Sequence, residues 1–238
     1  MAKDILKAIE AETAYLEEKL KGEHSCQLVD EVKKYGFGSL EEYFNDKREY
    51  LFQQLKFEVI EVLPSECIKE GYRSLGEKLT SVFFVNTPET TVYVHTSKPY
   101  NDEFCIENNL PVYKLPSGGG TIVSGDKDVV VAIVVPDTFG VDTRFILNKF
   151  VQILKKYMDN IAIADNDILV DGSKVCGITY LRGNGMIAFL AHFSFSDTME
   201  LIDSICHIHG ESVKKPSYMT GLDRNILRAE VMKWLRCT

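Results

Sequence analysis

The sequence predicts an α+β fold in which a mixed or antiparallel sheet is flanked by helices. Apolar residues recur at helical spacing through residues 1–60, and short runs rich in Val, Phe, Tyr and Thr follow from Thr80 onwards. These strand-like runs cluster instead of alternating strictly with helices, so a sheet made only of parallel strands is not expected. The 238 residues, 45% of them apolar, suffice for one large domain or for one domain with an appendage.

The N-terminal part is predicted to be helical. One helical face carries four apolar residues, namely Ile5, Ile9, Leu16 and Leu20. A second, mostly polar run at 26–34 predicts another surface helix. Ser39 and Glu42 have the spacing of a capping box, and apolar residues up to Val59 continue a long helix behind them. We expect Pro64 to end this helical arm.

The remaining elements are predicted from runs of β-branched and aromatic residues and from apolar stripes at helical spacing. Strands are expected at 81–85, 90–95, 111–114, 129–135, 168–170, 174–180 and 186–193. Helices are expected at 145–157, 197–207 and 223–236. The sequence therefore predicts two parts, a helical N-terminal extension at 1–62 and a main domain at 63–238.

Charge and cysteine usage exclude several classes of protein. The chain carries 27 Lys and Arg against 35 Asp and Glu, a net charge of −8, whereas proteins that bind nucleic acid through general charge are basic. Its longest apolar run, 129–135, is much shorter than the roughly twenty residues of a membrane span, and no export signal is visible. The 6 cysteines form no C-x-x-C pair. We expect a cytoplasmic protein with reduced thiols and with no nucleic-acid or membrane partner.

A run of glycines is the first candidate for a site. Ser117, Gly118, Gly119 and Gly120 lie between two strand-like runs. Three consecutive glycines are unfavourable inside a strand, so the segment is a tight hairpin turn, a bulge, or a loop whose exposed N–H groups bind a ligand. It is not a Walker A loop, because no Gly-Lys-Ser/Thr follows it.

A second candidate is the segment from Asn166 to Gly177. Asp171-Gly172 predicts a hairpin turn. Lys174 is either a solvated strand residue or a functional cation; on a partly buried strand its ammonium needs an anionic partner. Farther on, His192 ends an apolar strand and is either a hydrogen-bonded core residue or part of a site.

The order of these features resembles the catalytic domain of the lipoate–protein ligase A family. The resemblance rests on the Ser-Gly-Gly-Gly stretch within 111–123, on Asn166-Asp167-Ile168 leading through Asp-Gly-Ser-Lys to Gly177, and on His192 before a helix. It covers roughly Tyr72 to Asn225. It implies the biotin/lipoyl ligase fold, which is class II synthetase-like, for the main domain.

The resemblance also implies an activity. Such ligases activate lipoate or a related acid with ATP to an acyl-adenylate, and then pass the acyl group to a lysine of a carrier domain of the E2 or H-protein type. Lys174 would be catalytic, bridging the carboxylate and the α-phosphate. Substrate and nucleotide binding would fall to Lys114, Ser117, Gly118, Gly119, Gly120, Asn166, Asp167, Gly177 and His192. Asn166 and Asp167 would help to hold Mg²⁺ with ATP.

Three departures from the family pattern keep alternatives open. Lys114 and Leu115 stand where the family has two arginines, and Ser124-Gly125-Asp126 stands where it has a His-Asp pair. We expect no counterpart of the family's accessory domain, so the helical extension or a separate accessory subunit would take its place. The chain could instead be a non-catalytic homologue that binds an acyl group, a nucleotide or a carrier, or an interaction protein built around its helical arm.

A third alternative is an ATP-independent lipoyl or octanoyl transferase, which needs a reactive cysteine. In that branch of the family the cysteine precedes the lysine motif, at a loop that corresponds to 161–165, and no cysteine stands there. We expect Cys176 to face away from Lys174 as a core thiol. The sequence leaves open which acid is used: lipoate, biotin or octanoate.

Overall fold

The computed structural model describes residues 36, 40–116, 120–137, 141–206 and 217–236. The helices predicted before residue 35, the capping residue Ser39 and the three positions Ser117, Gly118 and Gly119 lie outside the described residues. The elements of the described part are, in order, α3 (Leu40–Gln53), β1 (Glu58–Val62), α4 (Pro64–Glu77), β2 (Ser81–Val85), β3 (Thr91–His95), α5 (Asp102–Glu107), β4 (Val112–Leu115), β5 (Ile122–Ser124), β6 (Val129–Pro136), α6 (Thr143–Leu154), β7 (Ile161–Ala164), β8 (Asp167–Val170), β9 (Ser173–Gly183), β10 (Met186–Phe193), α7 (Met199–Cys206) and α8 (Arg224–Arg236).

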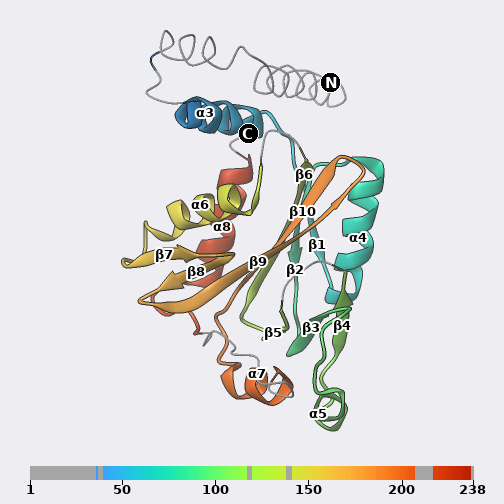
Figure 1. The fold of residues 1–238 in the computed structure, drawn as a ribbon. Helices are drawn as coiled ribbons and strands as arrows, with labels where there is room; N and C mark the ends of the chain where they lie inside the picture. Colours follow the sequence, from blue (N-terminus) through green and yellow to red (C-terminus); the bar gives the residue numbers. More distant parts are fainter. Residues whose placement is uncertain (1–35, 37–39, 117–119, 138–140, 207–216, 237–238) are drawn as a thin grey trace.

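A large mixed sheet forms the centre of the described part, with the strand order β1-β2-β6-β10-β9-β8-β7. β1 and β2 are parallel and the other neighbours are antiparallel, which confirms the predicted α+β class with a mixed sheet. Helices α6 and α8 cover one face, and α4 lies against the other (Figure 1). Every residue of β6 is buried, because both faces of this central strand are covered.

The two faces of the sheet carry separate apolar clusters, as the alternation of side chains along a strand requires. Val131 and Ile133 of β6 pack with Phe150 of α6 in the larger cluster. Val130 and Val134 of the same strand pack with Leu75 of α4 on the opposite face. Odd-numbered and even-numbered side chains of β6 therefore lie on opposite faces of the sheet.

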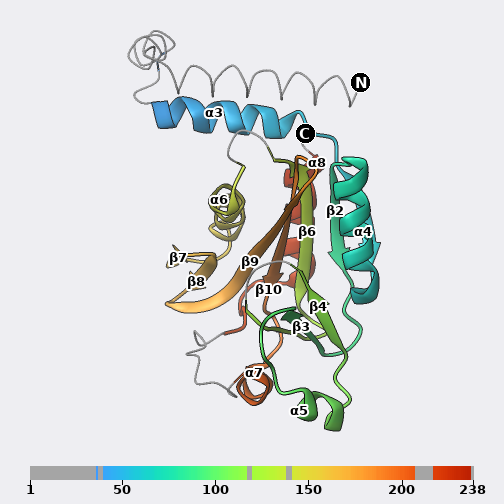
Figure 2. The ribbon, with the colours of Figure 1, turned by 45° about the vertical axis from the view of Figure 1, so that its right-hand side comes forward.

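A second, smaller sheet has the order β4-β3-β5 and packs under α5 and α7, at the end of the molecule opposite α3 (Figure 2). Strand β3 runs parallel to β4 and antiparallel to β5. Since β4 and β5 flank β3, these two strands do not pair with each other and form no β-hairpin. The hairpin alternative for the glycine run is therefore wrong.

The helix predicted to continue to Val59 is also wrong. Helix α3 ends at Gln53, and β1 pairs with β2 from Glu58 opposite Ser81 onwards. Phe52 is buried in the larger cluster, where its ring stacks on that of Trp234 at 5.3 Å between centroids. The β-branched residues of β1 gain more from the open edge of β2 than from continuing the helix, so tertiary pairing overrides local spacing.

Pro64 begins a helix instead of marking a turn after one. It occupies the first turn of α4, where its missing N–H leaves no hydrogen bond unmade. Four elements were not predicted at all: α4, α5, β5 and β7. Among the residues that the structure describes, no helix has both the length and the apolar character needed to cross a bilayer.

Candidate active site

The hairpin between β8 and β9 sets the position of Lys174. Asp171 and Gly172 both have positive φ, 50° and 79°, as a two-residue type I′ turn requires, which confirms the predicted turn. Asp167 stands directly opposite Gly177 in this pairing. The turn thereby brings Lys174 on β9 alongside β8, the strand that carries Asp167.

Lys174 forms an ion pair with Asp167 over Gly177. The distance from Lys174 Nζ to Asp167 Oδ1 is 2.9 Å, and the side chains are 34% and 12% exposed. A Cβ at Gly177 would lie 3.0 Å from Lys174 Nζ and 3.3 Å from Asp167 Oδ1. Gly177 therefore provides the space in which the ammonium and the carboxylate meet.

His192 extends this group across the sheet. It stands opposite Gly177 on one side and opposite Val130 on the other. Directly opposed residues share a face, so Asp167, Gly177 and His192 form one row across β8, β9 and β10. Val130 belongs to the cluster under α4, which places the row on the face opposite α6 and α8.

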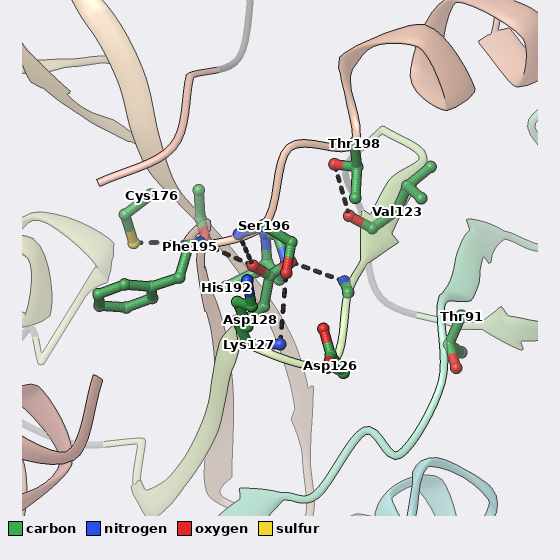
Figure 3. Close-up of polar contacts among 12 residues, drawn as sticks. Thr91, Val123, Asp126, Lys127, Asp128, Cys176, His192, Phe195, Ser196 and Thr198 are labelled. Carbon is green, nitrogen blue, oxygen red and sulfur yellow. Dashed lines mark hydrogen bonds and ion pairs between the residues drawn. The ribbon is translucent and has the colours of Figure 1, made fainter. Parts of the chain in front are cut away.

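His192 is held by the buried carboxylate of Asp128, which lies directly before β6 (Figure 3). The distance from His192 Nε2 to Asp128 Oδ2 is 3.0 Å, and the Asp128 side chain is 0% exposed. Oδ1 accepts hydrogen bonds from the backbone N–H groups of Phe195 at 2.6 Å and Ser196 at 2.7 Å. Oδ2 also accepts one from the N–H of Gly125 at 2.8 Å.

These contacts keep Asp128 ionised. Burial by itself raises the pKa of a carboxyl group, but the hydrogen bond from His192 and those from the N–H groups of Phe195 and Gly125 act in the opposite direction. The net effect lowers the pKa of Asp128 below its ordinary value of 3.8. A buried anion with this many donors is a fixed part of the fold and not a solvated acid.

The turn that carries Asp128 fits closely against the segment after β10. A Cβ at Gly125 would lie 2.3 Å from Oγ and 2.4 Å from Cβ of Ser196, so only glycine fits. Farther along, Thr198 Oγ1 donates a hydrogen bond of 3.4 Å to the carbonyl of Val123. The segment after β10 thus contacts both the turn before β6 and strand β5 of the small sheet.

The structure brings together only part of the residues that the sequence suggested. Lys174, Asp167, Gly177 and His192 gather on one face. Lys114 is exposed on β4 of the small sheet, and Gly120 is exposed, with nothing within 4 Å of where a Cβ would lie. Asn166 is exposed in the turn before β8, where its carbonyl accepts a hydrogen bond from Ile178 N–H.

Asp128 is the residue that sequence reasoning missed. Its one local signal is that a carboxylate directly precedes the apolar run at 129–135, where an unpaired buried charge would be unfavourable. Such a carboxylate needs partners, and a search for a histidine near the end of another apolar strand would have suggested His192.

Comparison with known proteins gives a family. The family model of the lipoyl protein ligase A/B catalytic domain matches residues 72–225, well over half of the chain. The chain belongs to this family. No curated protein matches the chain.

Solved structures of lipoate ligases share the fold. The structure of LipL1 from P. falciparum in complex with lipoate superposes with a TM-score of 0.63 at 11% identity, over 76% of this chain and 62% of that one. A bipartite lipoate protein ligase of Thermoplasma acidophilum, solved with its E2 lipoyl domain, gives 0.62 at 12% identity, over 77% and 85%. Lipoate-protein ligase A bound with ATP gives 0.60 at 11% identity, over 76% and 83%.

The carboxylate of Asp167 is a donor of the kind that Mg²⁺ prefers. Within the described residues, no group of three or more His, Cys, Asp or Glu could hold a metal ion. Mg²⁺ in nucleotide sites commonly takes one or two protein carboxylates and completes its shell with phosphate and water. Asp167, with the amide oxygen of Asn166 beside it in the chain, offers ligands of this kind.

Cys176 is a core thiol, as predicted. It is buried in the larger cluster, and burial strongly raises its pKa. Residues 174 and 176 would share a face on a regular strand. Ile168 is opposite Cys176 and the next residue, Leu169, is opposite Lys174, so Val175 is an extra residue in β9 that lets Lys174 and Cys176 point to different faces.

A cavity of about 410 Å³ lies elsewhere, between the segment that follows α6, the β8–β9 hairpin and the segment before α8. Its walls include Asp159, Ser173 and Tyr218, and none of Lys174, Asp167 and His192 lines it. It is distinct from the face on which the ion pair lies.

Proposed function

We propose that this member of the lipoyl protein ligase A/B family activates lipoate or a related acid with ATP and transfers the acyl group to a lysine of a lipoyl carrier domain. One observation carries the proposal, the ammonium of Lys174 held 2.9 Å from Asp167 over Gly177. The complexes solved for structural relatives, with lipoate, with ATP and with an E2 lipoyl domain, support the same substrates and partner.

The chemistry explains why a lysine is needed there. When a carboxylate attacks the α-phosphate of ATP, two anionic groups approach each other and negative charge builds up at phosphorus. An ammonium placed between the two groups offsets their repulsion and stabilises the charge that develops in the transition state. Asp167 holds Lys174 in place before the substrates arrive.

Other parts of the chain would complete the site. Backbone N–H groups of Ser117–Gly120 would bind phosphate or the acyl carboxylate, and Lys114 would add a second cation. Mg²⁺ held by Asp167 and Asn166 would supply charge neutralisation to the phosphates. The free thiols among the described cysteines fit a cytosolic setting.

A second candidate function is that of a non-catalytic homologue that binds an acyl group, a nucleotide or a carrier. Leu115, at a position where the family has an arginine, is buried with 8% exposure, so no cation replaces the lost one at that point. The transferase alternative, in contrast, has little support, because the burial of Cys176 disfavours a thiolate.

The test combines the protein with ATP, Mg²⁺, a lipoyl domain and, in turn, lipoate, biotin or octanoate. The carrier should gain the mass of one acyl group only when ATP is present. Lys174→Ala should abolish the gain, whereas Lys155→Ala, an exposed position at the end of α6 on the other face, should not. If an acid or nucleotide binds by calorimetry but the carrier never gains mass, the non-catalytic function is correct.

A further inference from the structure

The hydrogen bonds of Asp128 fix which ring nitrogen of His192 carries a proton. An ionised carboxylate only accepts hydrogen bonds, so Nε2 of His192 must donate to it. The Phe195, Ser196 and Gly125 N–H groups occupy the other acceptor positions, and they prevent the carboxylate from turning away. With Nε2 engaged, Nδ1 is the ring nitrogen that remains for a substrate.

The imidazole also lies next to the candidate catalytic lysine. Side chains of directly opposed residues start about 5 Å apart, and the space above Gly177, opposite His192, holds the end of Lys174. Each of the two basic side chains has its own carboxylate partner, Asp167 for Lys174 and Asp128 for His192. The row therefore contains two separate pairs.

The proposed transfer step requires a group that accepts a proton, and the His192–Asp128 pair can provide one. The lysine of a carrier domain arrives as an ammonium and must lose a proton before its nitrogen can attack. Lys174 as an ammonium has no lone pair to accept that proton, whereas a neutral imidazole has one at Nδ1.

We propose that His192 is the general base of the transfer step and that Asp128 is its positioning residue. The ammonium of the carrier lysine first gives one proton to Nδ1 of His192, and its neutral nitrogen then forms a bond to the acyl carbonyl carbon. The second proton leaves the nitrogen for solvent once this bond has formed. The bond between that carbon and the phosphate oxygen breaks, and AMP leaves with the electron pair. The imidazolium is stabilised by the Asp128 carboxylate and returns its proton to solvent. This inference rests on the proposed function.

The test separates proton transfer from acyl binding. Synthetic lipoyl-adenylate is given to an excess of enzyme, with either a lipoyl domain or hydroxylamine as the acceptor, and rates without enzyme are subtracted. His192→Gln and Asp128→Asn should slow transfer to the lysine by about 100-fold or more. Transfer to hydroxylamine, which is already neutral at pH 7, should stay within a few fold. The control is His95→Gln at the end of β3, where the ring forms a hydrogen bond with Ser97, and it should change neither rate.

Each outcome has a definite meaning. Equal losses with both acceptors, or unchanged transfer to lysine, would overturn the inference while leaving the proposed function in place. A wild-type enzyme that transfers to neither acceptor would overturn the proposed function itself.

A spectroscopic measurement checks the tautomer without any activity. In ¹⁵N-histidine spectra, assigned through His192→Gln, Nε2 of His192 should carry the proton in the wild type. Asp128→Asn keeps an oxygen for Phe195 and Ser196 but turns an NH₂ toward His192, so the proton should move to Nδ1. A proton on Nδ1 alone in the wild type would contradict the proposal.

Discussion

Replacing Gly177 with alanine should abolish most activity while leaving the stability of the fold almost unchanged. The new methyl carbon would lie 3.1 Å from Cε and 3.0 Å from Nζ of Lys174. Since unbonded carbons prefer separations of about 3.5–4.0 Å, the end of Lys174 must retreat by roughly 0.5 Å or adopt another rotamer.

The substitution should affect stability and reaction rate to different extents. Moving a flexible side chain off its preferred rotamer costs about 0.5–1.5 kcal/mol, and replacing glycine with alanine restores about 0.4–1 kcal/mol by restricting the unfolded chain. The free energy of unfolding should therefore change by less than about 1 kcal/mol. A catalytic group misplaced by about 1 Å can slow a reaction about 100-fold, and we expect a loss of this order.

Urea unfolding and single-turnover acylation of a lipoyl domain measure these two effects. Gly183→Ala is the matched control, because Gly183 lies on the same strand and a methyl group there meets nothing within 4 Å. If Gly177→Ala acylates the carrier as fast as the Gly183→Ala control, then the packing of Lys174 over Gly177 has no role in the reaction.

Three other changes test neighbouring parts of the structure. Because the folded-state pKa of Asp128 is lowered, its stabilising effect is complete above about pH 3.8 and is lost as the pH falls through the folded pKa. Asp128→Asn should lower the free energy of unfolding at pH 7 by about 2–3 kcal/mol. The free energy of unfolding should also fall less steeply in acid than in the wild type. If urea titrations at several pH values show the same fall in both proteins, this prediction is refuted. Gly125→Ala should destabilise the fold by about 1–3 kcal/mol through its clash with Ser196. Adding Ser196→Gly removes the clashing Cβ and should restore part of the thermal stability, whereas Ser196→Ala keeps that Cβ and should not. Cys176→Ala should keep carrier acylation within about threefold of wild type, since burial raises the pKa of this thiol; complete loss in a folded variant would favour a thioester mechanism.

The parts that the sequence predicted well are those encoded locally. The β8–β9 hairpin follows from the backbone freedom of Asp171-Gly172, and the central strand β6 follows from an unbroken apolar run. The glycine at 177 and the lysine at 174 are close in the chain, so their spacing was already visible as a motif.

The parts that it did not predict depend on contacts between distant segments. The partners of Asp128 in the second half of the chain are 64 to 68 residues away and meet it only because β10 pairs with β6. Strand β1 resembles the continuation of a helix until the edge of β2 is available to it. The direction of Cys176 depends on a register shift at which β9 has one residue more than its partner β8. Local propensity contains none of this information.

The most direct test of the account is the rate at which the enzyme forms an acyl-adenylate from ATP and lipoate. Lys174→Met removes the ammonium and keeps most of the aliphatic stem, so folding should be preserved. The wild type should form the adenylate, Lys155→Ala should match it, and Lys174→Met should be slower by at least about 100-fold. Adenylate formed at the wild-type rate by Lys174→Met, or none formed by the wild type with lipoate, biotin or octanoate, would contradict the assignment of Lys174 as the centre of the site.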